Sequence, residues 1–244
     1  MALLEVQSVT VRFGGNVAVQ DVSFGAEAGT ITGLIGPNGA GKTTLFNVIT
    51  GLLSPTRGKV LVEGHDITRL PPFKRARRGI ARTFQRLELF GVLTVRENIQ
   101  VAASIRKRHG GVEEAPAETA ARLIERVGLH DVADMRSDAL PTGQARLVEL
   151  GRALATRPRL LLLDEPASGQ DESETEHFAD LLRDLASEGM GILLVEHDMQ
   201  LVMNVCEVIH VLDFGRLMAA GTPAEIRTNP AVLAAYLGSE WQPA

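Results

Sequence analysis

Residues 36 to 43 read Gly-Pro-Asn-Gly-Ala-Gly-Lys-Thr, and this stretch decides the fold. It matches the pattern G-x-x-x-x-G-K-[ST] and stands between an apolar strand pattern, TITGLIG, and an apolar helical stretch, TTLFNVITGLL. Glycines let backbone N–H groups turn inward around the phosphates of a nucleotide, and the following helix presents its positive end to the same anion. The sequence therefore predicts a nucleotide-binding loop made of Gly36, Pro37, Asn38, Gly39, Ala40, Gly41, Lys42, Thr43 and Thr44.

The last residues of this loop have defined chemical roles. The ammonium group of Lys42 is expected to reach the terminal phosphates, and the hydroxyl of Thr43 is expected to ligate Mg²⁺. The alternative is a glycine turn with an exposed lysine, and the strand and helix patterns on either side argue against it.

Two carboxylates and a histidine follow two further apolar runs. Leu160–Leu163 leads into Asp164 and Glu165, and the run from 191 to 196 leads into His197. Such runs, with a helical stretch between them, are typical of buried parallel strands, whose carboxyl ends share one edge of a sheet. We expect Asp164 to hold Mg²⁺, directly or through water, Glu165 to polarise the attacking water, and His197 to approach the γ-phosphate. In a chain without a phosphate loop, a helix cap and a structural histidine would be the better interpretations.

Periodicity divides the rest of the chain. Residues 3–13 alternate as a strand, whereas residues from about 87 to 156 have helical periodicity, which predicts a helical insertion in an α/β fold. Two short strand patterns flank a turn at Asp213–Arg216. Thr222–Glu225 then has the form of a capping box with proline at the first helical position, and a last short helix is expected at about 231–238.

Composition limits the class of protein. The 244 residues are 45% hydrophobic, and no apolar run approaches the roughly 18 to 20 residues that span a bilayer. The N-terminus does not have the pattern of a signal peptide, and the single cysteine, Cys206, is expected to be a core residue. A net charge of -5 argues against a nucleic-acid binder. The basic run 74–82 is expected to be a solvated surface, with lipid headgroups or a partner subunit as the alternative.

Together these motifs resemble those of the ATP-binding cassette (ABC) ATPases, and the resemblance covers nearly the whole chain. It implies that Gln85 in RTFQ links the nucleotide and its Mg²⁺ to the helical subdomain, that Phe13 in VRFGG stacks on adenine, and that Asp171 in ASGQD belongs to a loop crossing between two subunits. The implied catalytic residues are Glu165, His197, Gln85 and Lys42, and the implied metal-binding residues are Thr43, Gln85 and Asp164.

The signature segment of that family, L-S-G-G-Q, corresponds here to Leu140, Pro141, Thr142, Gly143 and Gln144. Proline removes a hydroxyl and a backbone N–H, two donors that a phosphate site would use, whereas Thr142 offers a substitute hydroxyl. The crossing loop also departs from the family, which more often has leucine where Gln170 stands.

The resemblance implies a P-loop ATPase core with an antiparallel β subdomain and an inserted α-helical subdomain. A phosphate loop and a signature in one chain lie too far apart to close on one nucleotide, so two ATPase chains, identical or paralogous, are expected to form a head-to-tail dimer around ATP. Transmembrane permease subunits are the expected partners, at the cytoplasmic face of the inner membrane, with Leu87, Leu89, Phe90 and Leu93 near their docking site or in the helical core. The expected parts are a core at 1–86 and 157–220, a helical subdomain at 87–156 and a C-terminal extension at 221–244.

The C-terminal text LLVEHDMQLVM and GTPAEIRTNPAVLAAYLG is similar to that of ATPase subunits for branched-chain amino acid import. ATPases for urea or other amide or amino acid import, or for lipopolysaccharide export, are the alternatives within the family. A DNA-repair ATPase would need a long coiled coil between phosphate loop and signature, and a translation-associated protein would need two cassettes. A non-catalytic nucleotide-binding regulator is disfavoured because Glu165 is present.

Overall fold

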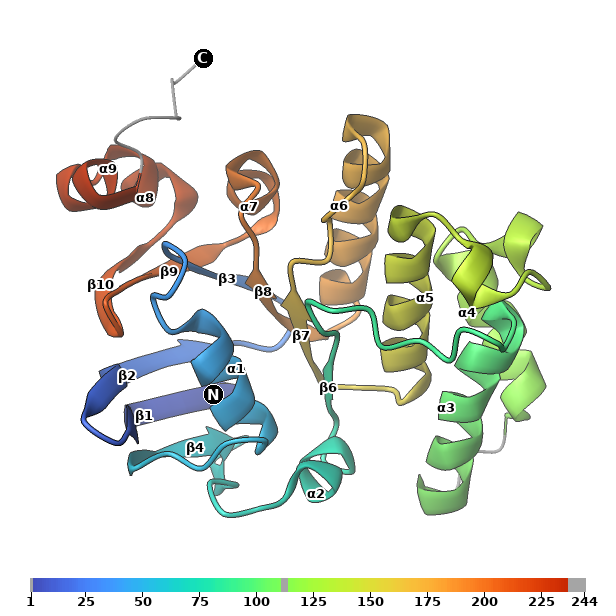
Figure 1. Ribbon diagram of the computed structural model, residues 1–244, viewed down its shortest axis with the longest axis horizontal. Helices are drawn as coiled ribbons and strands as arrows, with labels where there is room; N and C mark the ends of the chain where they lie inside the picture. Colours follow the sequence, from blue (N-terminus) through green and yellow to red (C-terminus); the bar gives the residue numbers. More distant parts are fainter. Residues whose placement is uncertain (1, 111–113, 237–244) are drawn as a thin grey trace.

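The computed structural model describes residues 2–110 and 114–236, which form two β-sheets and a group of helices beside them (Figure 1). The smaller sheet is antiparallel, with strand order β2-β1-β4-β5. Its strands are β1 (Leu4–Phe13), β2 (Asn16–Ala26), β4 (Arg57–Val62) and β5 (His65–Asp66). The first strand lies where residues 3–13 were expected to form one, but its burial alternates only over Leu4–Gln7, and a register shift follows between Val6 and Val9.

The larger sheet has strand order β10-β9-β3-β8-β7-β6 and is parallel from β9 to β6. The predicted buried parallel strands are confirmed, because every residue of β3, β7 and β8 is buried. The strands of this sheet are β3 (Ile31–Ile35), β6 (Ile80–Arg82), β7 (Leu160–Asp164), β8 (Gly191–Val195), β9 (Val208–Asp213) and β10 (Arg216–Gly221).

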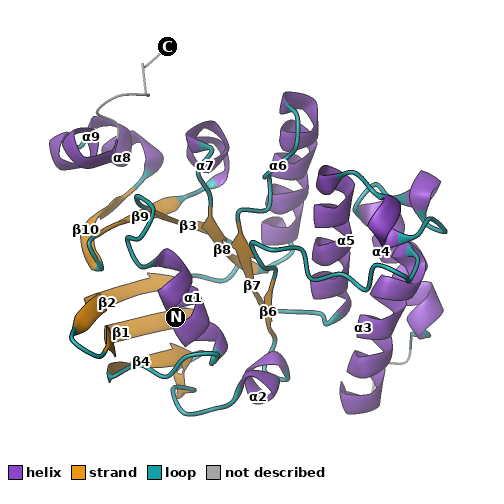
Figure 2. Ribbon diagram, in the orientation of Figure 1, coloured by secondary structure: helices purple, strands orange, loops and turns teal. Residues whose placement is uncertain are grey.

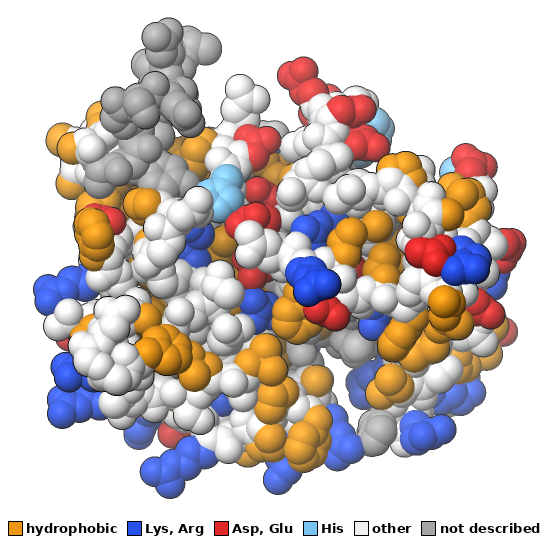
Figure 3. Space-filling view, in the orientation of Figure 1, with side chains coloured by type: hydrophobic (Ala, Val, Ile, Leu, Met, Phe, Trp, Pro, Cys, Tyr) orange, Lys and Arg blue, Asp and Glu red, His pale blue; other side chains and the backbone are white. Residues whose placement is uncertain are grey.

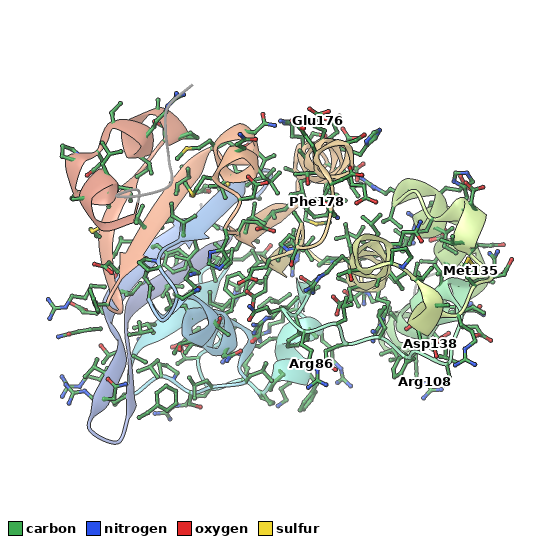
Figure 4. The ribbon with its side chains drawn as sticks, turned by 45° about the horizontal axis from the view of Figure 1, so that its top comes forward. Arg86, Arg108, Met135, Asp138, Glu176 and Phe178 are labelled. Carbon is green, nitrogen blue, oxygen red and sulfur yellow. The ribbon has the colours of Figure 1, made fainter. Side chains whose placement is uncertain are left out.

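Other elements lie on both faces of the larger sheet (Figure 2), and alternate residues of its parallel strands belong to two different core clusters. Leu161 and Leu163 pack in one core cluster with α6 (Glu172–Ser187) and α7 (Met199–Val205), whereas Leu160 and Leu162 pack with α1 (Lys42–Thr50) and the smaller sheet. Figure 4 shows Phe178 on the inner side of α6 and Glu176 on its outer side. The sheet is therefore covered on both faces, as the continuous apolar runs predict.

The helical group holds α3 (Val95–Gly110), α4 (Pro116–Arg126) and α5 (Thr142–Ala155), with 3-10 turns at His130–Val132 and Ser137–Ala139. Arg108, Met135 and Asp138 all lie in this group (Figure 4). Helices α3 and α5 approach closely, since a Cβ on Gly151 would lie 2.8 Å from the Cδ1 atom of Ile99. The expected helical insertion thus corresponds to a compact unit, and its exact boundaries remain a prediction.

The C-terminal part contains α8 (Pro223–Thr228) and α9 (Pro230–Tyr236). The capping box predicted at Thr222 is confirmed, because its hydroxyl accepts a hydrogen bond from the amide of Glu225 and the Glu225 side chain accepts one from Thr222. The end of the last predicted helix, residues 237 and 238, lies outside the described residues.

The basic run 74–82 corrects one expectation, because it is not a uniformly solvated surface. Arg75, in α2 (Pro72–Ala76), is only 2% exposed, and the side chain of Arg82 at the end of β6 is 6% exposed. Lys74, Arg77 and Arg78 are exposed as expected. The two buried guanidinium groups have specific partners inside the protein, which a count of charges cannot show.

Cys206 is buried, and burial raises the pKa of its thiol to about 12, so the prediction of an unreactive core cysteine is confirmed. Among the helices of the described residues, none combines the length and the apolar character needed to cross a membrane.

Candidate functional site

The candidate residues meet at one edge of the parallel sheet. Strands β3, β8, β7 and β6 are parallel neighbours, so the loops that follow their carboxyl ends lie side by side. The phosphate loop follows β3, His197 follows β8, Glu165 follows β7 and Gln85 follows β6. Strand β8 lies between β3 and β7, so His197, which follows β8, lies between the phosphate loop after β3 and the carboxylates at the end of β7.

Glycine is required at two points of the phosphate loop. Gly36 has a φ of 155°, and a Cβ there would lie 2.2 Å from the carbonyl oxygen of Leu212. Gly41 has a φ of 107°, and a Cβ there would lie 2.8 Å from the carbonyl oxygen of Ala18. The loop can pass between β9 and β2 only because these side chains are absent.

Lys42 lies along this loop. Its ammonium group donates to the carbonyl oxygens of Gly36 at 2.6 Å and Pro37 at 3.1 Å. Burial lowers the pKa of Lys42, while Glu165 and Asp164 act in the opposite direction and favour its charged form. No side chain caps the N-terminus of α1 at Gly41, so the first amides of that helix are available to an anion.

Glu165 is held by two predicted site residues. The side-chain amide of Gln85 donates to both carboxylate oxygens at 3.1 Å. The Nε2 atom of His197 lies 3.0 Å from Oε1 of Glu165, and because an ionised carboxylate only accepts, this nitrogen carries the proton. Glu165 also has a φ of 52°, in the left-handed region that is strained for a residue with a side chain. The structure thus brings together three residues separated widely in the sequence.

Asp164 is almost fully buried at the end of β7, and its carboxylate accepts a hydrogen bond of 2.8 Å from Arg82. Thr43 lies exposed in the first turn of α1. Within residues 2–110 and 114–236, no group of three or more His, Cys, Asp or Glu side chains could hold a metal ion. This sparse donor set, one carboxylate and one hydroxyl, is what a magnesium site has when phosphate oxygens supply further ligands, so the residues fit nucleotide-bound Mg²⁺.

Sequence reasoning missed Glu196, which ties two parts of the site together. Its buried carboxylate accepts hydrogen bonds from the amide of Ala167 at 2.8 Å and from the amide of His197 at 3.0 Å. Burial raises the pKa of Glu196, although these hydrogen bonds favour the charged form. A charged residue at the end of the apolar run GILLVEH was the available signal.

A second missed pair holds the backbone around Gln85. Arg146 donates to the carbonyl oxygens of Phe84, at 2.6 Å, and of Gln85. Glu149 accepts a hydrogen bond of 2.8 Å from the amide of Glu88. Both residues are buried on α5, so the segment that carries Gln85 is fastened to the helix that follows the signature.

The remaining predicted residues lie elsewhere on the chain. Phe13 is 52% exposed at the end of β1, next to the hairpin that leads into β2. Pro141 stands at the N-cap of α5 and provides no capping side chain, and a Cβ on Gly143 would lie 3.2 Å from the Oε2 atom of Glu174. Asp171 caps α6 by accepting a hydrogen bond of 2.8 Å from the amide of Glu174. The signature segment also packs against the loop that follows Glu165, because a Cβ on Gly169 would lie 3.1 Å from the Cγ2 atom of Thr142.

On the face seen in Figure 3, histidine, acidic and basic side chains lie close together near the centre. Helix α1 lies against the two sheets, while α5 lies within the helical group beyond β7 (Figure 1). The phosphate loop and the signature segment thus belong to different parts of the chain.

The family model described as "ABC transporter" matches residues 19–168, and the model "Branched-chain amino acid ATP-binding cassette transporter" matches residues 216–241. The high-affinity branched-chain amino acid transport ATP-binding protein BraF of Pseudomonas aeruginosa is 43% identical over 97% of this chain and 98% of its own length. LivG of Escherichia coli, with the same description, is 41% identical over 97% and 98%. The lipopolysaccharide export ATP-binding protein LptB of Haemophilus influenzae is 35% identical over 99% of this chain and all of its own length.

Solved structures agree with these matches. A nucleotide-free ATP-binding cassette from an ABC transporter superposes with a TM-score of 0.87 at 31% identity, covering 97% of this chain and 99% of that one. A dimeric cassette bound to ADP and phosphate superposes with a TM-score of 0.81 at 26% identity, covering 90% and 98%. With the phosphate loop and the residues around Glu165 converging at one sheet edge, these matches show that the chain belongs to the ATPase subunits of the ABC transporter family.

Proposed function

We propose that this chain hydrolyses MgATP as part of a dimer and drives the import of branched-chain amino acids through membrane permease subunits, at the cytoplasmic face of the inner membrane. The observation that carries the substrate class is its similarity to BraF and LivG, at 43% and 41% identity over nearly their whole lengths. The proteins for lipopolysaccharide export are similar at 35% and 36% identity, which makes that class the second candidate.

The arrangement supports phosphoryl transfer to water. The phosphate loop offers backbone amides and the Lys42 ammonium group to the β- and γ-phosphates. Gln85 and His197 fix the position of the Glu165 carboxylate, and Oε2, which accepts only from Gln85 among the described residues, keeps a lone pair to orient and deprotonate water. Thr43, Asp164 and Gln85 would hold Mg²⁺, which when bound neutralises negative charge on the phosphates. Phe13 is exposed enough to stack on an adenine ring.

Two chains are needed to complete each site in this account. The segment Leu140–Gln144 opens α5 in the helical group, and its helix N-terminus is directed to a phosphate bound by the partner chain. Asp171, at the start of α6, lies on the loop that would cross between the chains. Because these contacts exist only in the closed dimer, ATP favours closure and its hydrolysis releases the chains.

Serine at the signature should strengthen this closure. Pro141 has neither a side-chain hydroxyl nor a backbone N–H, whereas serine would add both as donors toward the phosphate of the partner site, and one such hydrogen bond has a net value of about 1 kcal/mol. We expect Pro141→Ser to tighten ATP-driven dimerisation about fivefold, because 1.4 kcal/mol corresponds to a tenfold change. Sedimentation in MgATP, in a Glu165→Gln background that prevents turnover, measures the dimer affinity. Pro71, which also caps a helix without a side-chain hydrogen bond, gives the matched control Pro71→Ser, and equal affinities in all three proteins would refute the idea.

A groove beside the site supports docking of a permease segment. It has a volume of about 320 Å³, lies between α2 and β6 on one side and α3 and α5 on the other, and is lined partly by Leu52, Phe84, Ala102 and Arg152. Of the residues expected near this docking site, Phe90 is 46% exposed, Leu89 packs partly against the core, and Leu93 lines a separate hollow on α3.

The function can be tested on the whole transporter, purified from native membranes through a tag on this chain and reconstituted in proteoliposomes. We expect leucine, isoleucine or valine, supplied with the cognate binding protein, to raise ATP hydrolysis several-fold and to accumulate inside. The same preparation carrying Glu165→Gln should bind ATP and transport nothing. Stimulation by urea alone, or extraction of lipopolysaccharide, would assign the chain to another class of ABC transporter.

A further inference from the structure

Arg82 occupies a position that connects the groove with the carboxylate assigned to Mg²⁺. It is the last residue of β6 and lines the groove together with Thr83 and Phe84. Its guanidinium carbon lies 4.9 Å from the ring centre of Phe84 and 5.3 Å from that of Phe46, which is buried on α1. The guanidinium group therefore has an aromatic contact on the groove side and another on the side of the phosphate-loop helix.

All three nitrogens of this guanidinium group have partners. One donates to Oδ2 of Asp164 at 2.8 Å, another to Oδ1 of Asn47 at 2.6 Å, and Nε donates to the carbonyl oxygen of Thr83 at 3.2 Å. Asn47 lies on α1, so one side chain joins the phosphate-loop helix, the edge strand β6 and the end of β7. Because all three nitrogens donate to fixed acceptors, the guanidinium group is held in one orientation.

The Asp164 carboxylate is paired with Arg82 and is also the expected ligand of Mg²⁺. Asp164 is only 1% exposed, and Arg82 balances its charge in the chain without nucleotide. A metal ion bound to Asp164 would lie close to the guanidinium group, and two positive charges in a poorly hydrated place repel each other. Removing the guanidinium would remove this repulsion and leave the buried carboxylate without its ion-pair partner, which favours binding of a metal ion there.

We propose that Arg82 is a positioning residue that serves as the internal counter-cation of Asp164 and weakens the binding of Mg²⁺ to this carboxylate. Through the contact between Arg82 and Phe84, the affinity for Mg²⁺ also depends on the position of the Phe84 ring in the groove. Phe84 is 37% exposed, so a segment that enters the groove touches the ring on which the guanidinium group lies. This inference rests on the proposed function, because it takes Asp164 as the magnesium carboxylate.

The test compares the binding of a fluorescent ADP analogue in excess Mg²⁺ and in EDTA. In Arg82→Met we expect the ratio of the two dissociation constants to rise about fivefold or more, within the usual range of coupling between two sites. Arg82→Lys, which keeps the charge, should stay near the wild-type ratio. Thermal unfolding gives a second measure: the midpoint of Arg82→Met should fall most in EDTA and recover in MgADP, whereas a merely structural role would lower it equally in both conditions.

Two further variants sharpen the result. Arg96→Met removes a guanidinium group from an exposed ion pair with Asp134, 2.8 Å apart in the helical group, and should leave the ratio unchanged. Phe84→Ala keeps the ion pair but frees the guanidinium group on the groove side, so the ratio should shift in the same direction as in Arg82→Met, by a smaller factor. This variant also serves if Arg82→Met does not fold.

The outcomes separate this inference from the proposed function. If Mg²⁺ has no effect on ADP binding by the wild-type chain, the magnesium assignment itself fails. If wild type responds to Mg²⁺ but Arg82→Met has an equal or smaller ratio, Arg82 does not oppose the metal and the counter-cation role is overturned. An unchanged ratio in Phe84→Ala overturns the connection to the groove.

Discussion

Glu165→Gln is expected to lower the rate of ATP hydrolysis at least a hundredfold while leaving ATP binding intact. Loss of a general base typically costs a factor of about 10² to 10⁴, and the amide of glutamine cannot take the proton of the attacking water. Glutamine has nearly the same shape, so the left-handed backbone at φ 52° and the contact with His197 need not change. Phosphate release measures turnover, and equilibrium binding of labelled ATP measures affinity.

The same variant should accumulate as a dimer in MgATP, because closure occurs without the hydrolysis that releases it. Glu176 provides a matched control, since it is a glutamate exposed on the outer side of α6, and Glu176→Gln should hydrolyse ATP at the wild-type rate. Turnover by Glu165→Gln within tenfold of wild type would show that another residue prepares the water.

Arg75→Met is expected to reduce the free energy of unfolding by about 3 to 5 kcal/mol, the range for removing one partner of a buried charged contact. The Arg75 guanidinium group donates to the carbonyl oxygens of Val48 at 2.6 Å and Ile49 at 2.8 Å, near the C-terminus of α1, and to those of Leu70 and Thr68, each at 2.8 Å. The Val48 and Ile49 carbonyls carry the negative end of the helix dipole of α1, and all four carbonyls lose a charged donor once the guanidinium is gone. Burial lowers the pKa of Arg75 to about 10, so the group remains charged at neutral pH.

Urea unfolding in the absence of nucleotide measures this loss. Lys74, the exposed neighbour of Arg75 in α2, gives the control Lys74→Met, which should change stability by less than about 0.5 kcal/mol. Arg75→Lys should be intermediate, since one ammonium group cannot reach four carbonyl oxygens. If Arg75→Met and Lys74→Met were equally stable, the hydrogen bonds of Arg75 would have no net effect on folding.

The phosphate loop could be predicted because its chemistry is local: eight consecutive residues define both the turn and the helix that follows. The meeting of Glu165 and His197 could be anticipated for a different reason, whereas only the resemblance placed Gln85 near the nucleotide, because strand β6 was not predicted. Parallel strands end at one edge of a sheet, so residues that directly follow such strands must become neighbours. Their expected roles remain predictions that the experiments above address.

The buried arginines could not be predicted in the same way. Lys74, Arg75, Arg78 and Arg82 belong to one basic run, yet α2 turns only Arg75 inward and β6 carries Arg82 to the end of the sheet. Whether such a side chain meets solvent or a carbonyl depends on α1 and β7, which are distant in the sequence. Glu196 and Arg146 were missed for the same reason, since their partners are backbone groups of remote loops.

The most direct test of the shared nucleotide site mixes two inactive chains. Lys42→Ala removes the ammonium group that is expected to bind phosphate, and Gly143→Asp places a carboxylate at the start of α5, close to Glu174, where a phosphate is expected. Each variant alone should be inactive. In a mixed dimer, one site combines the intact phosphate loop of one chain with the intact signature of the other. We therefore expect a one-to-one mixture to recover up to about a quarter of the wild-type hydrolysis rate, increasing with protein concentration. A mixture that stays as inactive as its components at every concentration would contradict the account.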